Sequence, residues 1–134
     1  MNATDAVQER MRGLFPDLLG VTFIEVTPDC VRAELDAREE ICTASGIIHG
    51  GAVMGFVDTL GAVATVMNLE GDARTTTIES KTNFFRALKS GGKIIGECTP
   101  LHKGRTTMVW QTRVYDENKK LAAQIIQTQI VLSS

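Results

Sequence analysis

Hydrophobic and polar residues follow two different spacings along the chain. Residues 6–15 carry apolar side chains at helical spacing and end before Pro16, which predicts a short amphipathic helix. Residues 50–68 form a longer helical stretch that is strongly apolar. Runs with period-two alternation or many β-branched residues predict six strands, at residues 21–26, 31–37, 74–85, 93–102, 105–115 and 121–132.

Short turn signals join the predicted strands. Pro28 and Asp29 follow the first strand, and Gly91, Gly104 and Asn118 fall between later ones. Connections of hairpin length make neighbouring strands antiparallel. The sequence therefore predicts an α+β fold in which the long helix packs on an antiparallel sheet and the short N-terminal helix acts as a lid or clamp on the sheet edge.

Length and charge narrow the classes of function. The chain has 134 residues, of which 43% are hydrophobic and 22% charged, so residues 1–134 are predicted to form a single domain rather than a disordered segment. The net charge of −2 and the pI near 5.7 argue against a basic surface for nucleic acid or for an anionic membrane. We therefore expect neither of these among the partners.

Cysteines and apolar runs bear on the compartment. Cys30, Cys42 and Cys98 form no C-x-x-C pair and are expected to be reduced. The first ten residues hold two acids and no apolar signal segment. The apolar run 46–69 is long enough to span a bilayer but carries Asp58 in its middle, which is costly in hydrocarbon. These features predict a cytoplasmic protein.

The two faces of the long predicted helix differ in character. Its apolar stripe, which we expect to pack on the sheet, consists of Val53, Phe56, Val57, Leu60, Val63, Ala64 and Met67. The face around Asp58 consists of Gly51, Met54, Gly55, Gly61, Ala62 and Thr65. Glycine inside a helix costs about 0.5–1 kcal/mol relative to alanine, so these glycines predict the close approach of a partner backbone, a ligand or both. Asp58 is then a functional acid or a buried acid that caps another element.

His49 immediately precedes this helix and is followed by two glycines, Gly50 and Gly51. The first N–H groups of a helix have no partner within it and stabilise negative charge. His49 and Asp58 are nine positions apart, which corresponds to about 13.5 Å of helix rise and puts the two side chains on opposite sides. If both serve one site, Asp58 faces the helix N-terminus of a second copy in a two-fold dimer. Otherwise His49 is a cap or a packed imidazole.

The motif I-I-H-G-G-A-V-M-G-F-V-D-T, with an acid nine positions after the histidine, resembles the signature of hotdog-fold acyl-CoA thioesterases. The resemblance is to the PaaI-like (phenylacetate-degradation) branch of the 4-hydroxybenzoyl-CoA thioesterase superfamily and extends over nearly the whole chain. It implies a sheet wrapped around one central helix. It also implies hydrolysis of acyl-CoA to free acid and CoA at a dimer interface, with dimers associating into tetramers.

The same resemblance assigns catalytic roles to four residues. Asp58 is implied to be the nucleophile or the general base towards water, and the Gly50 N–H polarises the thioester carbonyl. His49 helps to orient the thioester. Thr77, in T-T-T-I-E-S, falls where members of this branch carry a serine or threonine near the attacking water. A helix N-terminus is a suitable oxyanion donor, so the implied roles agree with simple electrostatics.

Substrate-binding residues are implied as well. Thr43 stands where the family often has Asn or Gln, and a hydroxyl has a shorter reach than an amide. Arg86, Lys103 and Arg105 match positions that present cations to the phosphates of CoA, although solvated turn charges would look the same. CoA is part of the substrate, so no cofactor is expected. No H-E-x-x-H spacing points to a metal.

Two other functions are compatible with such a fold. A non-catalytic acyl-CoA binding or sensing module is one, because Thr43 would weaken the grip on the thioester. The other is dehydration or hydration of acyl thioesters, for which the expected G-H-F-P segment is absent. The sequence does not predict the preferred acyl group.

Overall fold

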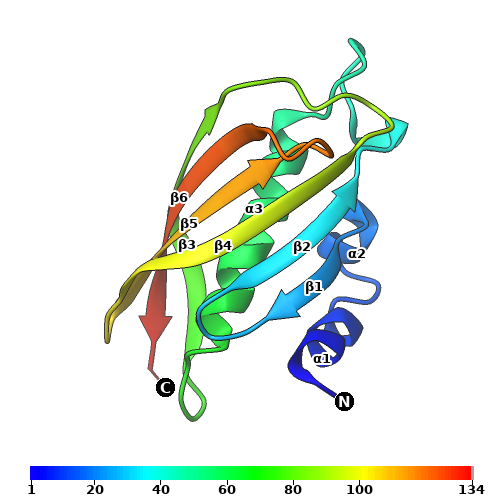
Figure 1. The fold of residues 1–134 in the computed structure, drawn as a ribbon. Coiled ribbons are helices and arrows are strands. Elements are labelled where there is room, and N and C mark those ends of the chain that lie inside the picture. The colour runs from blue at the N-terminus through cyan, green and yellow to red at the C-terminus, as the bar shows by residue number, and fades with distance from the viewer. Residues whose placement is uncertain (134) are drawn as a thin grey trace.

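In the computed structural model, which describes residues 1–133, a curved sheet wraps around a long helix (Figure 1). The helices are α1 (Ala3–Arg10), α2 (Phe15–Leu19) and α3 (Gly50–Val66), and a short 3-10 turn covers Glu39–Ile41. The strands are β1 (Thr22–Val26), β2 (Val31–Asp36), β3 (Arg74–Phe84), β4 (Lys93–Lys103), β5 (Thr107–Tyr115) and β6 (Leu121–Leu132). Neighbouring strands pair antiparallel in the order β1-β2-β4-β5-β6-β3. The predicted α+β fold around one central helix is confirmed.

The N-terminal region differs from the single helix predicted at residues 6–15. The chain forms two helices there, because Gly13 adopts a φ of +77° and turns the chain between α1 and α2. Pro16 lies in the first turn of α2, where its missing N–H leaves no helical hydrogen bond unmade. Proline therefore marks the start of a helix here, not the end of one.

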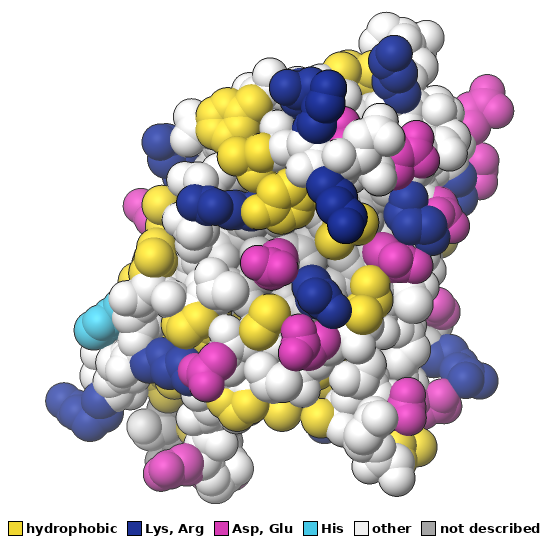
Figure 2. All heavy atoms as spheres, in the orientation of Figure 1, with side chains coloured by type: hydrophobic (Ala, Val, Ile, Leu, Met, Phe, Trp, Pro, Cys, Tyr) yellow, Lys and Arg dark blue, Asp and Glu magenta, His cyan; other side chains and the backbone are white. Residues whose placement is uncertain are grey.

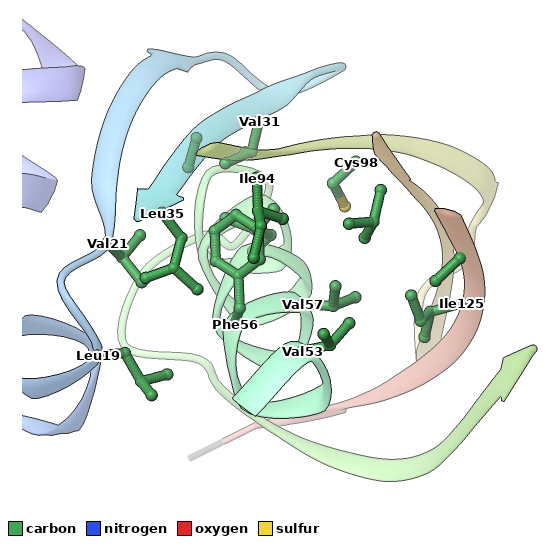
Figure 3. Close-up of a cluster of buried hydrophobic side chains, with 14 of the residues drawn as sticks. Leu19, Val21, Val31, Leu35, Val53, Phe56, Val57, Ile94, Cys98 and Ile125 are labelled. Atoms are coloured by element: carbon green, nitrogen blue, oxygen red, sulfur yellow. The ribbon is translucent and has the colours of Figure 1, made fainter. Parts of the chain in front are cut away.

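The core lies between α3 and the concave face of the sheet (Figure 3). The predicted stripe is buried at Val53, Phe56, Val57, Leu60, Val63 and Ala64, whereas Met67 is only half-buried. Trp110 on β5 is fully buried, and its indole N–H donates to Thr65 Oγ1 at 2.8 Å. The placement of Thr65 on the open face is therefore wrong. The curved sheet covers more of α3 than the apolar stripe alone indicates.

Two glycines of α3 are contacted from within the chain. A Cβ on Gly61 would lie 2.2 Å from the Gln127 side chain, and one on Gly55 would lie 2.8 Å from the Phe15 ring. The prediction that a partner backbone or a ligand approaches these two glycines is wrong, because β6 and α2 approach them instead. Asp58 remains exposed on the same face of α3.

The two edges of the sheet are finished differently. On β1, the Gln8 side chain of α1 accepts from the Phe23 N–H at 2.7 Å and donates to the Val21 carbonyl at 2.9 Å. One amide thus takes the place of a neighbouring strand, as expected for a clamp on the sheet edge. The other edge is β3, whose pairing with β6 leaves its outer side without a neighbouring strand in residues 1–133.

The convex face of the sheet is chemically mixed. Figure 2 shows acidic and basic side chains interspersed with apolar ones on the face turned to the viewer. On β4, Lys93 pairs with both Glu34 at 3.1 Å and Asp36 at 3.3 Å.

Among the described residues, no helix is long and apolar enough to cross a membrane.

Candidate active site

Asp58 and Thr77 meet near the open edge of the sheet. Asp58 is exposed in the middle of α3, and Thr77 is half-buried on β3. The Thr77 hydroxyl donates to Asp58 Oδ1 at 2.6 Å. Ile78 is the extra residue of a β-bulge directly after Thr77, and a bulge re-aims the side chains beside it. The structure thus brings two of the implied catalytic residues together, and the alternative of a buried, capping Asp58 is wrong.

Two buried glutamines on β6 are hydrogen-bonded to this pair through Thr77, and the sequence did not lead us to predict them. Gln127 and Gln129 are both 0% exposed. Gln129 Nε2 donates to Thr77 Oγ1 at 2.6 Å and to Gln127 Oε1 at 2.9 Å. A signal was available, because both glutamines alternate with outward residues on the same face of the strand as Ile125, where a core residue would be apolar.

The N-terminus of α3 has one free donor. His49 caps the helix: its Nδ1 accepts from the Gly51 N–H at 2.8 Å, and its carbonyl accepts from the Ala52 N–H at 2.9 Å. In the described part of the chain, the Gly50 N–H has no acceptor. Because Nδ1 accepts, a neutral His49 imidazole carries its proton on Nε2. The capping alternative for His49 is confirmed, and its orienting role stays a prediction.

A hollow of about 400 Å³ opens beside Gly50. It is lined by Thr43, Ile47, Ile48, Gly50, Val53 and residues 84–88. The Phe84 ring lies 3.2 Å from the position of a Cβ on Gly50, so a larger residue there would displace the ring. The hollow therefore combines a mainly apolar wall with one backbone donor.

Thr43 lies in this hollow but uses its hydroxyl locally. Its Oγ1 donates to the Ile47 carbonyl at 3.3 Å and lies 2.8 Å from the Ser45 hydroxyl. The predicted substrate-binding position is thus present in the wall of the hollow. Its proton, however, is directed to its own loop.

The three cations implied to bind CoA lie at two ends of the molecule. Arg86 lines the hollow beside Gly50 and also a neighbouring hollow of about 620 Å³. Lys103 is the last residue of β4, where it pairs with Asp29 at 2.6 Å, and Arg105 follows in the next turn. This is the C-terminal end of α3, whose 17 residues span about 26 Å. Within one chain, Lys103 and Arg105 are remote from Gly50.

The cysteines offer little nucleophilic character. Burial raises the pKa of Cys98 to about 12, and burial together with the nearby Glu25 raises the pKa of Cys30 to about 11. Both are therefore neutral thiols at physiological pH, and the thiolate is the nucleophile. Cys42 directs its Sγ at two backbone carbonyls. In residues 1–133, no three His, Cys, Asp or Glu side chains gather as a metal site requires.

A family model described as "Thioesterase superfamily" matches residues 45–123. The chain is 27% identical over 128 residues to the 1,4-dihydroxy-2-naphthoyl-CoA hydrolase of Escherichia coli, covering 96% of this chain and 93% of that protein. It is 32% identical over 99 residues to the proofreading thioesterase EntH of Klebsiella pneumoniae, covering 74% and 72%.

Solved structures share the fold. A mutant thioesterase from Pseudomonas aeruginosa superposes with a TM-score of 0.93 at 22% identity, covering 98% of this chain and 95% of that one. The PaaI protein of Escherichia coli, from the branch that the motif resembles, has a TM-score of 0.86 at 15% identity, covering 96% and 91%. The chain therefore belongs to the thioesterase superfamily, has its hotdog fold and is a thioester hydrolase.

Proposed function

We propose that the chain hydrolyses acyl-CoA thioesters, with Asp58 of one copy acting opposite the Gly50 N–H of a second copy. The observation that carries the proposal is the Asp58 carboxylate, which is exposed and hydrogen-bonded to Thr77. It lies on the same helix whose Gly50 N–H has no acceptor among the described residues. Thioester hydrolysis needs a donor for the carbonyl oxygen and a group that attacks the carbon or activates water. The relative in Escherichia coli is named as a hydrolase of a CoA thioester.

The chemistry assigns one task to each residue. The thioester carbonyl oxygen accepts from the Gly50 N–H, where the helix end stabilises the negative charge that develops on it. Asp58 either attacks the carbonyl carbon, releasing the CoA thiolate and leaving an anhydride for water to open, or takes a proton from an attacking water. Thr77 holds Asp58 Oδ1. His49, whose Nδ1 accepts from the Gly51 N–H, has its Nε2 left to help orient the thioester.

A second copy is needed because one helix cannot bring both groups to one carbonyl. Gly50 and Asp58 are eight positions apart on α3, about 12 Å along the helix axis. The free outer side of β3 is the natural place for the second copy, since an open edge strand pairs readily with an identical one. Antiparallel pairing of the two β3 strands reverses one molecule relative to the other. The N-terminal end of one α3 then lies with the C-terminal end of its partner.

This reversal gives Lys103 and Arg105 a function. Remote from Gly50 in their own chain, they lie at the end of the molecule that receives the partner's helix N-terminus, where they can hold phosphates of CoA. Arg86 lies beside Gly50 and serves the same substrate from the other protomer. Association of two such dimers into a tetramer and a cytoplasmic location remain proposals.

The test is a hydrolysis assay over aryl, short-chain and long-chain acyl-CoA substrates. We expect Asp58→Asn to lower kcat by about 10²–10⁴-fold, because an amide neither attacks nor accepts the proton. Asp5→Asn, the same change on the exposed helix α1, is the control and keeps full activity. Equal turnover of Asp58→Asn and the wild type, both folded, would show that the role given to Asp58 is wrong.

One observation favours a second candidate, a module that binds acyl-CoA without turnover. Thr43 directs its hydroxyl to the Ile47 carbonyl, so the usual grip on the thioester is weakened. Calorimetry distinguishes the two functions. Binding of CoA esters with no hydrolysis across the panel would support the module, whereas turnover of any of them supports the enzyme.

A further inference from the structure

A closed circuit of hydrogen bonds begins and ends on neighbouring residues of α3. The Val57 carbonyl accepts from Gln127 Nε2 at 2.9 Å, and Gln127 Oε1 accepts from Gln129 Nε2 at 2.9 Å. Gln129 Nε2 also donates to Thr77 Oγ1 at 2.6 Å, and the Thr77 hydroxyl donates to the Asp58 carboxylate at 2.6 Å. The circuit thus leaves the backbone of α3, crosses β6 and β3, and returns to α3 at the proposed reactive group.

Each hydrogen bond in the circuit sets the direction of the next. A carbonyl only accepts, so the side-chain nitrogen of Gln127 faces Val57 and its oxygen faces Gln129. Gln129 therefore presents its nitrogen to both Gln127 and Thr77. With its oxygen occupied by an incoming N–H, Thr77 keeps its own proton for the carboxylate, which only accepts when ionised. Reversal of any one bond would put two donors or two acceptors face to face.

Gly61 provides the room that the circuit requires. The Gln127 carboxamide lies 2.2 Å from the position of a Cβ on Gly61, so any side chain there would push the amide away from Val57. Glycine is unfavourable inside a helix by about 1 kcal/mol relative to alanine. Gly61, which destabilises the helix, therefore lies against the fully buried side-chain amide of Gln127, which is hydrogen-bonded to the equally buried amide of Gln129.

We propose that Gln129 is a positioning residue for hydrolysis: through Thr77 it fixes the orientation of the Asp58 carboxylate towards the thioester. This inference rests on the function proposed for Asp58. Thr77 binds Oδ1, and Oδ2 has no donor within residues 1–133. Oδ2 is consequently the oxygen that faces the substrate or the attacking water. Thr77 is a fixed donor and does not remove a proton.

The test compares Gln129 variants in two backgrounds. Gln129→Met keeps the length of the side chain but cannot donate, and Gln129→Asn keeps the amide but withdraws it by one methylene. We expect either change to lower kcat by about 10–100-fold with KM within about twofold, because a misplaced reacting group costs turnover rather than binding. In a Thr77→Val background, the same changes should cause no further loss, because the connection to Asp58 is already broken. Thr77→Ser, which keeps the hydroxyl that Thr77→Val removes, should retain near wild-type kcat.

Control variants separate positioning from stability and from the proposed function. Gln124→Met makes the same substitution on the outward side of β6 and should leave kcat unchanged. Losses that add up in the double variants would overturn the inference and point to a general weakening of the fold. If Asp58→Asn is inactive while both folded Gln129 variants keep wild-type kcat, only the inference fails. Full activity of Asp58→Asn would instead refute the proposed function.

Discussion

The sheet has one closed edge and one open edge. At β1, the Gln8 side chain of α1 hydrogen-bonds with the Phe23 N–H and with the Val21 carbonyl next to the strand. At β3, no strand of residues 1–133 pairs with the outer side, and this is the strand that carries Thr77 next to Asp58. An exposed edge is a site of self-association that proteins usually cover. The fold covers the edge that lies away from Asp58 and leaves free the edge beside it, which is where a second copy would complete the site.

The sharpest test of this difference exploits two matched isoleucines. Ile78 on β3 and Ile24 on β1 are each the extra residue of a β-bulge on an edge strand, 55% and 43% exposed. We expect Ile78→Lys to convert a dimer into monomers, because two like charges would face each other across the paired edges. Hydrolysis should fall by about 100-fold or more, since a monomer has no Gly50 N–H opposite its own Asp58.

Light scattering after gel filtration measures the mass, and acyl-CoA hydrolysis measures the activity. Ile24→Lys should alter neither, because the β1 edge is already covered. A monomeric Ile78→Lys variant with wild-type activity would refute the role given to the open edge.

A smaller effect on hydrolysis is expected from a change at Lys103 or Arg105, which pairing of the two β3 strands would bring to the N-terminus of the partner's α3. Arg105→Ala should raise KM for acyl-CoA by about 3–10-fold with kcat unchanged, the scale of one partly exposed charge on a phosphate. Added salt should raise KM less in this variant than in the wild type. Arg113→Ala, an exposed arginine on β5, is the control. An unchanged KM and salt dependence would remove Arg105 from the site.

The mildest change concerns the closed edge. Gln8→Ala removes two hydrogen bonds and leaves the Phe23 N–H and the Val21 carbonyl to water. We expect the free energy of unfolding to fall by about 1–2 kcal/mol with kcat and KM unchanged. Chemical denaturation together with the activity assay measures both. A loss of activity without a loss of stability would mean that the β1 edge also serves the site.

The sequence predicted the sheet and the central helix because period-two and helical spacings are local properties of the chain. It misplaced what depends on tertiary contacts. Pro16 begins a helix, since its position relative to Gly13 decides which side of it is helical. Thr65 is buried because β5 curves far enough around α3 for Trp110 to reach it. Neither outcome follows from residues adjacent in sequence.

The candidate site shows the same difference between residues that a local motif reveals and residues that only tertiary contacts bring together. Asp58, His49 and Gly50 were found because they share one motif with a helix start and a mid-helix acid. Gln129 was missed, although a glutamine on the inward face of a core strand is an anomaly visible in the sequence. Its partner Thr77 comes from another strand that pairs with it only in the folded sheet.

In the proposed mechanism each site joins Asp58 of one copy to Gly50 of another, and mixing two inactive variants tests this pairing. Asp58→Asn removes the acid. Gly50→Pro removes the N–H, at a helix start that accepts proline, because His49 before it has φ −66° and ψ 133°. The proline ring also displaces the Phe84 ring beside it, a change in the same hollow.

After the subunits exchange in an equal mixture, half of the dimers are mixed, and each mixed dimer has one intact site. We expect the mixture to recover about one quarter of wild-type activity. A mixture that forms mixed dimers and stays inactive would contradict this pairing, because both residues would then have to come from the same chain.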